Sequence, residues 1–520
     1  MIPFGDTNTH AQAWVDGVPQ DSDAKGVVNE TCQDSSPTTQ VNMMHAEDNE
    51  TLPTLPTPAP EQVRPPQRYN RQTYKYPGQS IDLAVNGIHL EELEDYRPGG
   101  YHPVHIHDIL DGRYEVAHKL GAGGYATVWL CRDTDLKCWN AVKIVVADKS
   151  SETCQEIQFR STLGDSHHAV LPESHFWIEG PNGRHLALVM PVLGPSISAA
   201  RDLVTDDATL RKICRRMAEA LHYFHDNEIC HGDFRPSNIL HRMHSINSLT
   251  KHQIWRLLGS PFSSEYYSPV TGKDGSEPGP HAPRYAIRTA DMRRLQDWII
   301  TDDIAVVDFG VAFETSDPPQ GSTGIPPSYS APELLFEGCP SPSSDVWALA
   351  CSILCLYTGE PLGALVHDAI SDMELYFGPL PERYRQAYDR LYKENGTDDE
   401  SDDGSECEDP YPEPMDYSGC TWPVIPIDEA AKGYLVWEER EIQEKMKTAQ
   451  SEDGYTDIFN AAIGEPRKLG GFGPSQEREY RMPRHEVLQL TDLLRPMFHY
   501  EEDERPDTTE ILEHPWFATT

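Results

Sequence analysis

The stretch HGDFRPSN at residues 231–238 decides the fold class. It follows residues 210–224, whose apolar side chains recur at steps of three and four, as they do on one face of a helix. Within the stretch, Asp233 is suited to accept the proton of an attacking hydroxyl, and the amide oxygen of Asn238 is suited to hold Mg²⁺. The spacing therefore predicts a phosphoryl-transfer site on a loop that follows a helix.

Two motifs upstream fit the same chemistry. GAGGYATV at residues 121–128 stands between two strand-like runs, and glycines there let backbone N–H groups approach phosphate oxygens. A turn that is glycine-rich for steric reasons alone is the alternative. AVKI at residues 141–144 predicts a strand with one lysine, Lys143, which needs a carboxylate partner if it is buried. Glu156, in a helix-like segment, is the candidate partner; a lysine at the surface is the alternative.

Two motifs downstream complete the set. DFG at residues 308–310 follows the apolar run IAVV, and the carboxylate of Asp308 suits a hard cation that bridges phosphates. APE at residues 331–333 is expected to tie to the C-terminal helices through a buried pair between Glu333 and Arg505. The five motifs, in this order and on these element types, identify a protein kinase fold.

The order of elements predicts an α+β, two-lobed architecture, because short strand-like runs come first and helical patterns follow. Residues 1–95 are acidic and rich in proline, which is typical of a disordered tail. We assign residues 96–194 to the β-rich N-lobe and residues 195–518 to the α-rich C-lobe. Two inserts are expected in the C-lobe, at about 241–301 and 393–480, the first because it is a loop rich in Ser, Pro and Gly.

The composition limits the partners. The 520 residues include 84 acidic and 43 basic side chains, for a formal net charge of −41. Such a chain repels phosphate backbones and attracts basic partners, so we expect no direct binding to nucleic acid. The longest apolar run has 12 residues, from Val346, which is too short for a bilayer span, and no secretory signal is expected at the N-terminus.

Two further segments carry a resemblance to a known family. YRPGGYHPV at residues 96–104, hereafter the GGY segment, resembles the start of the SR-protein kinases, and HAPRYAIRTADMRRL at residues 281–295 is similar to the spacer of their fungal branch. The resemblance extends over about residues 94–518. It implies an ATP- and Mg²⁺-dependent serine/threonine kinase, monomeric, cytoplasmic or nuclear, that phosphorylates serines in arginine/serine-rich splicing proteins. The alternative is a catalytically weak, kinase-like scaffold that binds ATP or basic partners.

The resemblance also assigns roles by position. LVMPVLG at residues 188–194 corresponds to the hinge, where adenine would bond the carbonyl of Pro191 and the amide of Leu193. The expected catalytic residues are Lys143, Glu156, Asp233 and Arg235. The expected nucleotide-binding residues are Gly121, Gly123, Gly124, Val128, Ala141, Lys143, Met190, Pro191 and Leu193. The expected magnesium ligands are Asn238 and Asp308.

Besides Ala126, which replaces the third glycine of the turn as a mild change, three positions depart from the common kinase pattern. Gly232 replaces the arginine that usually pairs with a phosphate on the activation segment, so we do not expect a phosphate switch of that type. Arg235 stands where a lysine usually reaches the γ-phosphate, and it keeps the charge but not the compact ammonium. Pro326 replaces a threonine that usually bonds the catalytic aspartate and lysine. Without that hydroxyl, looser positioning of Asp233 is expected.

Overall fold

The computed structural model describes residues 74–75, 91–201, 204, 206–272, 274–295, 299–321, 323–363, 366–395, 458–469 and 478–518. All of these belong to one compact unit, residues 70–520. Most of the predicted tail 1–95 and most of the insert predicted near 393–480 lie outside the described residues.

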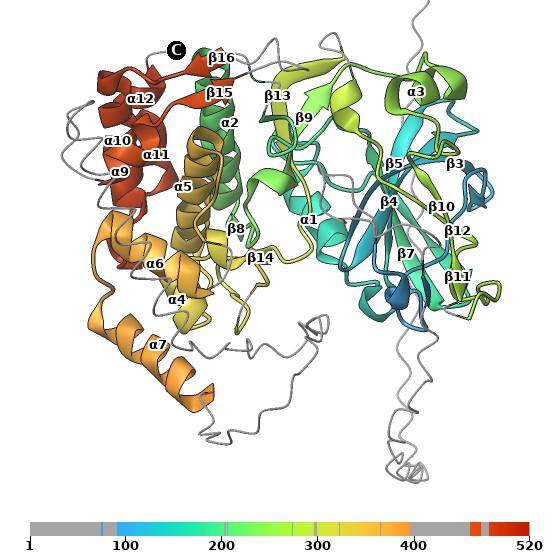
Figure 1. The fold of residues 1–520 in the computed structure, drawn as a ribbon, viewed down its shortest axis with the longest axis horizontal. Helices are drawn as coiled ribbons and strands as arrows, with labels where there is room; N and C mark the ends of the chain where they lie inside the picture. Colours follow the sequence, from blue (N-terminus) through green and yellow to red (C-terminus); the bar gives the residue numbers. More distant parts are fainter. Residues whose placement is uncertain are drawn as a thin grey trace, which may run out of the picture. The chain divides into compact units, whose positions relative to one another are not determined.

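The N-lobe is one antiparallel sheet with the strand order β2-β3-β4-β5-β7-β6 (Figure 1). Alternating apolar side chains of the central strands build its core, in which Val116, Val142 and Ala187 are fully buried. A single α-helix, α1 (Gln155–Leu163), comes between β5 and β6, after the short 3-10 turn η3 (Ala147–Lys149). The strands are β2 (Ile109–Leu110), β3 (Tyr114–Gly123), β4 (Ala126–Asp133), β5 (Trp139–Val145), β6 (Ser174–Gly180) and β7 (Gly183–Pro191).

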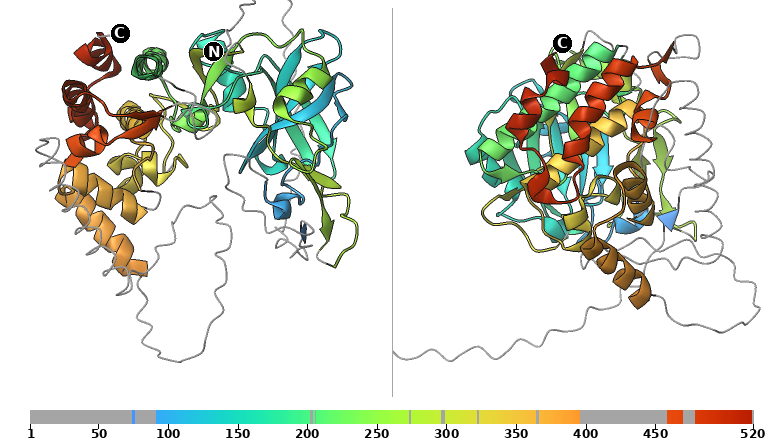
Figure 2. Two further views of the ribbon diagram at one scale, coloured as in Figure 1. Left: turned by 45° about the horizontal axis from the view of Figure 1, so that its top comes forward. Right: turned by 90° about the vertical axis from the view of Figure 1, so that its left-hand side faces the viewer.

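The C-lobe gathers the longer helices around α2 and α5, as the two views of Figure 2 show. The predicted helix at 210–224 is confirmed within α2 (Asp207–Asp226), which begins at a side-chain cap by Asp206. Helix α5 (Pro342–Thr358) begins with a capping box on Ser341 and is buried on nearly all sides. The other helices are α4 (Pro332–Phe336), α6 (Val366–Phe377), α7 (Glu382–Asn395), α9 (Ile458–Gly464), α10 (Arg484–Met497), α11 (Thr508–Glu513) and α12 (Pro515–Ala518).

Two short ladders flank the loop that carries HGDFRPSN. Strand β8 (Ile229–Cys230) pairs with β14 (Phe313–Glu314), and β9 (Ile239–Met243) pairs with β13 (Ile300–Val306), both antiparallel. The loop 231–238 therefore begins at the end of one ladder and ends at the start of the other, as does the DFG motif on the opposite strands. These ladders bring two motifs that are about 70 residues apart in sequence to the same place.

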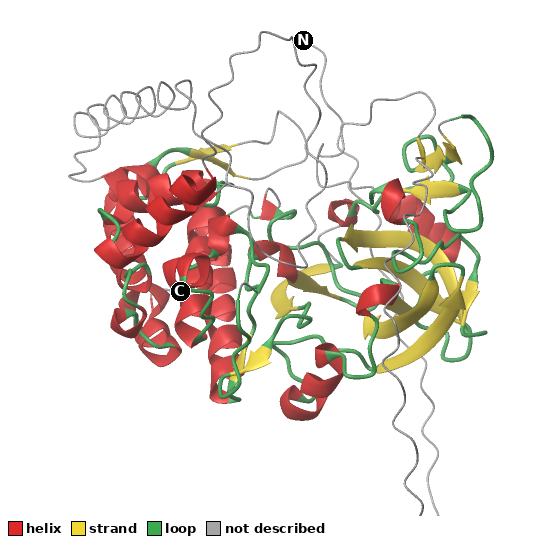
Figure 3. Cartoon of the chain, turned by 90° about the horizontal axis from the view of Figure 1, so that it is seen from below, coloured by secondary structure: helices red, strands yellow, loops and turns green. Residues whose placement is uncertain are grey.

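The first insert is not the C-lobe loop that the sequence predicted. It folds into regular elements, and Figure 3 distinguishes these from the surrounding loops: α3 (Lys251–Leu258), β10 (Tyr267–Pro269), β11 (Thr271–Gly272) and β12 (Tyr285–Ile287). The side chains of Ile254 and Leu258 pack with Ala117 and Leu130 of the N-lobe sheet. The indole of Trp255 donates to the carbonyl of Ala117 at 3.0 Å.

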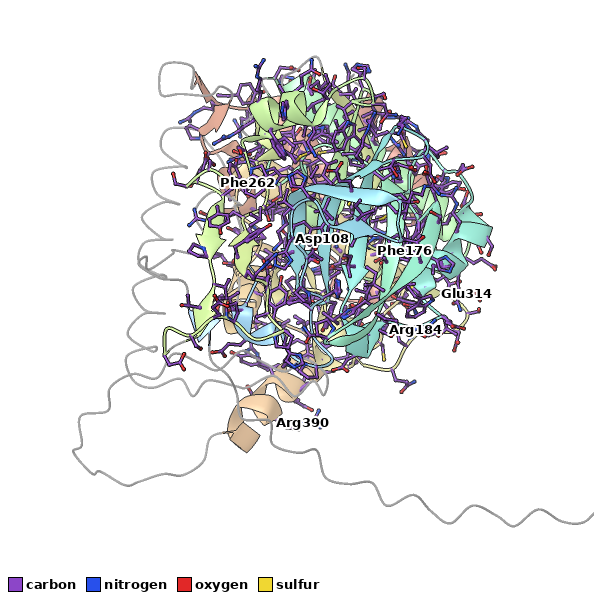
Figure 4. All side chains as sticks on the ribbon, turned by 90° about the vertical axis from the view of Figure 1, so that its right-hand side faces the viewer. Asp108, Phe176, Arg184, Phe262, Glu314 and Arg390 are labelled. Carbon is purple, nitrogen blue, oxygen red and sulfur yellow. The ribbon has the colours of Figure 1, made fainter. Side chains whose placement is uncertain are left out.

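Burial of apolar surface therefore holds the insert on the N-lobe, although its Ser-, Pro- and Gly-rich composition resembles that of a loop. Figure 4 looks onto this lobe and labels Phe262 of the insert together with Phe176 of β6 and Arg184 of β7. The remaining strands are β1 (Tyr74–Lys75), which pairs with β11, and β15 (Arg467–Leu469), which pairs with β16 (Arg478–Tyr480). Among the described residues, no helix is both long and apolar enough to cross a bilayer.

Candidate active site

The first turn of helix α5 holds the loop 231–238 in place. The carboxylate of Asp345, at the start of that helix, accepts the backbone N–H of His231 at 2.7 Å and that of Gly232 at 3.0 Å. Asp345 is 3% exposed, so both bonds are shielded from water. Sequence reasoning missed this residue, and its only signal was an acid at the edge of the apolar run that forms α5.

Asp233 lies in a polar setting within the same loop. Its carboxylate accepts the Nε–H of Arg235 at 2.9 Å on one oxygen and the amide of Asn238 at 2.7 Å on the other. Burial raises the pKa of Asp233, while the guanidinium of Arg235 acts in the opposite direction. A carboxylate with a raised pKa and a fixed orientation is suited to accept a proton.

The predicted partner of Lys143 is confirmed. The ammonium of Lys143 on β5 lies 2.6 Å from Glu156 on α1 and 2.6 Å from Asp308. Burial alone would lower the pKa of Lys143, but the two carboxylates outweigh it and raise that pKa, so the side chain stays charged. The same contact lowers the pKa of Asp308. The ammonium of Lys143 thus connects strand β5, helix α1 and the DFG motif.

The DFG motif points its aspartate at the site and its phenylalanine into the core. Asp308 has a left-handed backbone, with φ of 68°, which turns its carboxylate back toward Lys143. Phe309 is fully buried, with its ring 4.9 Å from that of His231 and 5.2 Å from that of Phe224. The Asp308 side chain remains 47% exposed, so its carboxylate is accessible from solvent.

The predicted nucleotide-binding residues meet at the same end of the N-lobe. Ala141 and Met190 belong to one apolar cluster, against which Val128 and Leu193 also pack. The glycine-rich turn joins β3 to β4, and a Cβ added to Gly121, Gly123 or Gly124 would have nothing within 4 Å. Packing therefore does not require these glycines, which argues against the steric explanation and fits an approach of phosphate to the backbone.

The two predicted magnesium ligands also fit their role. The amide nitrogen of Asn238 is used by Asp233, so its oxygen, the atom a cation needs, takes no part in those bonds. The carboxylate of Asp308 is ionised, because Lys143 holds its pKa low. An amide oxygen and an ionised carboxylate on neighbouring elements are hard ligands of the kind that Mg²⁺ prefers.

Gly232 occupies a slot with no room for a side chain. Its φ is +76°, and an added Cβ would lie 2.9 Å from the carbonyl oxygen of Val311. The carbonyl of Gly232 accepts the hydroxyl of Thr323 at 2.7 Å. Thr323, which sequence reasoning also missed, therefore connects the activation segment, which runs from the DFG motif to the APE motif, to the loop 231–238 without an arginine or a phosphate. Pro326 precedes the short turn η7 (Pro327–Tyr329) and offers no hydroxyl.

The predicted pair between Glu333 and Arg505 is confirmed. The guanidinium forms two bonds of 2.7 Å, one to each carboxylate oxygen, and the two side chains are 1% and 0% exposed. Arg505 also donates to the carbonyls of Ser343 and His499. The APE motif is thus fixed to the C-terminal helices by a bidentate contact.

Comparison with known proteins agrees with this geometry. The family described as "Protein kinase domain" matches residues 114–251. Residues 114–251 are therefore similar to a protein kinase domain, and the described lobes have the protein kinase fold. Residues in this match include the glycine-rich turn, Lys143, Glu156 and the whole loop 231–238. The fold of the described lobes and the positions of the five motifs are those the sequence predicted for a kinase.

Three individual relatives are named as protein kinases. The chain is 36% identical to serine/threonine-protein kinase spk-1 of Caenorhabditis briggsae over 193 residues, which are 33% of this chain and 17% of that protein. It is 37% identical to human SRSF protein kinase 3 over 174 residues, 30% of each chain. It is 25% identical to serine/threonine-protein kinase SRPK of Physarum polycephalum over 458 residues, 82% of this chain and 91% of that one. The matches to the first two therefore span less than a third of those relatives.

Proposed function

We propose that this protein is a serine/threonine kinase that transfers the γ-phosphoryl group of ATP to serines in arginine/serine-rich proteins. The observation that carries the proposal is the contact of Lys143 with both Glu156 and Asp308. It joins the elements that a kinase must align before transfer. The relative named SRSF protein kinase 3 and the net charge of −41 support a basic, arginine-rich substrate.

Each residue of the site would have its own role in the phosphoryl transfer. Lys143 would bind the α- and β-phosphates, and Arg235 would reach the γ-phosphate. Asn238 and Asp308 would hold Mg²⁺, which neutralises charge on the phosphates when bound. Asp233 would orient the serine hydroxyl and take its proton while the oxygen–phosphorus bond forms and the bond from the γ-phosphorus to ADP breaks.

A second candidate is a kinase-like scaffold. It is favoured by Pro326, which lacks the usual hydroxyl, and by Arg235, whose guanidinium lies on the catalytic carboxylate itself. Such a chain would bind ATP or a basic partner without efficient transfer. The presence of Asp233, Asn238 and Asp308 argues against it.

Transfer of ³²P from [γ-³²P]ATP to a peptide of repeated Arg-Ser pairs tests the proposal. We expect the wild-type chain to label the peptide and Asp233→Asn to lose about 10²–10⁴-fold in rate, because the substitution keeps the shape but removes the base. A Lys-Ser peptide of the same length is the control for substrate class. Equal background from wild type and variant would refute the enzyme and leave the scaffold, and equal rates on both peptides would refute the arginine preference. A cytoplasmic or nuclear location, a monomeric state and no direct binding to nucleic acid stay predictions.

A further inference from the structure

The GGY segment is a sequence motif that the proposed function leaves unexplained. We propose that it is a brace for the glycine-rich turn and that Tyr101 is a positioning residue for nucleotide binding. The inference rests on the proposed function, since it concerns the nucleotide of that same site. It is carried by one contact: the hydroxyl of Tyr101 donates to the carbonyl of Gly123 at 2.6 Å.

The glycines of the segment allow it to lie close to the N-lobe backbone. Gly99 has φ of 89°, and a Cβ there would come within 2.3 Å of the carboxylate of Asp148; a Cβ on Gly100 would come within 1.9 Å of the carbonyl oxygen of Asp95. In this close approach, Gly99 donates to the carbonyl of Asn182 at 2.7 Å and accepts from the amide of Asp148 at 2.8 Å. A larger residue at position 99 would strain the backbone and displace the Asp148 carboxylate, and one at position 100 would open the turn that runs from Asp95 to Tyr101.

The backbone of Tyr101 is fixed on both sides of its side chain. Its amide donates to the carbonyl of Asp95 at 3.0 Å, and its carbonyl accepts the side-chain amide of Asn182 at 2.5 Å. Tyr101 is 3% exposed and packs in one apolar cluster with Tyr96 and Val146. These backbone hydrogen bonds and the packing of the ring together fix the position of the Tyr101 hydroxyl.

The contact controls the turn that follows β3. A trans peptide is planar, so holding the carbonyl of Gly123 toward Tyr101 directs the N–H of Gly124 to the opposite side. Two residues further along the turn, the carbonyl of Tyr125 accepts the amide of Val146 at 2.9 Å. The turn is thus fixed before nucleotide arrives, and binding does not have to order it.

The hydroxyl of Tyr101 remains a donor at any ordinary pH. Burial raises its pKa above the usual range, and the carboxylates of Asp95 and Glu91 act in the same direction. A neighbouring tyrosine provides a matched control. The hydroxyl of Tyr96 is also buried in this cluster, with its ring 5.5 Å from that of Tyr101, but it donates to Glu91 instead of to the turn.

The test compares Tyr101→Phe with Tyr96→Phe in the full chain. Each variant loses one buried hydroxyl and keeps its ring, and Tyr96→Phe should lose at least as much in Tm, because its hydroxyl donates to a buried carboxylate. Only Tyr101→Phe should raise the KM for ATP and the Kd for MgADP, by about 2- to 12-fold, the factor that corresponds to one neutral hydrogen bond. The KM for the Arg-Ser peptide should change less than twofold in both variants.

Two results would overturn the brace. One is wild-type nucleotide affinity in Tyr101→Phe; the other is an equal loss of affinity in both variants, which would indicate general destabilisation. A wild-type chain that binds no nucleotide would overturn the proposed function and this inference together. Titration of the wild-type chain with MgADP therefore distinguishes failure of the proposed function from failure of the brace alone.

Discussion

Replacing Arg505 by methionine would remove the guanidinium that fixes the APE motif and leave its stem. Five acceptors each lose a donor: the two carboxylate oxygens of Glu333 and the carbonyls of Ser343, His499 and Tyr500. One hydroxyl, that of Ser344, would still donate to Glu333, at 2.9 Å. The carboxylate, 1% exposed, would then be a buried charge with no counter-charge.

The size of the effect follows from that burial. Removing one partner of a buried ion pair costs about 3–5 kcal/mol, because the other charge stays desolvated. The opposite substitution, Glu333→Gln, should cost less, about 1.5–3 kcal/mol, since Arg505 keeps three carbonyl acceptors and the amide keeps one oxygen. The double variant leaves no isolated carboxylate, so it should cost less than the sum of the two.

Equilibrium unfolding in urea, followed by tryptophan fluorescence, measures all four corners of this double-mutant cycle. We expect Arg505→Met to be the least stable single variant and the coupling energy to be about 0.5–3 kcal/mol. Additive single effects would contradict the pairing of Glu333 with Arg505. A greater cost for Glu333→Gln than for Arg505→Met would contradict the argument from the carbonyl acceptors.

Two further predictions concern the activation segment and the GGY segment. Thr323→Val should lower kcat about 2- to 12-fold through loss of the bond to the Gly232 carbonyl, and Thr323→Ser should restore it; steady-state kinetics that show equal rates for both variants would argue against this role. Burial, with His185 next to it, lowers the pKa of His102 to about 4. Since the unfolded chain then binds the proton more readily, stability should be retained above pH 6.5 and lost as the pH falls toward 4. His102→Gln should flatten that part of the Tm–pH curve, and an unchanged slope would exclude His102 as the cause.

The active site was predictable because its chemistry is local in sequence. Asp233 and Asn238 share one loop, and Lys143 needs a carboxylate if it is buried, so residue type and spacing made Glu156 its candidate partner. The pairing of Glu333 with Arg505 followed from charge at two motifs. Asp345 could not be found in this way, because its partners are backbone amides, which every residue carries.

The structure of the first insert could not be predicted from hydrophobic periodicity. Helix α3 has only two fully buried apolar side chains, Ile254 and Leu258, and they are buried by N-lobe residues more than 100 positions earlier, such as Ala117. A helix of eight residues is marginal by itself; α3 begins with a capping box between Thr250 and Gln253, and the surface it covers stabilises it further. The composition of the insert therefore indicated a loop. Its structure depends instead on the face of the N-lobe sheet that it covers, which cannot be recognised from the sequence of the insert.

The three departures from the kinase pattern are best understood together. A side chain at position 232 would strike the carbonyl of Val311, so the usual arginine has no room here, and its link to the activation segment is made by Thr323 through the backbone. The hydroxyl absent at Pro326 leaves Asp233 without one usual donor, and Arg235 provides another on the same carboxylate. Thr323 and Arg235 thus hold the loop where the usual contacts are missing, but the bond of Arg235 also occupies the catalytic carboxylate, so transfer requires that guanidinium to move to the γ-phosphate.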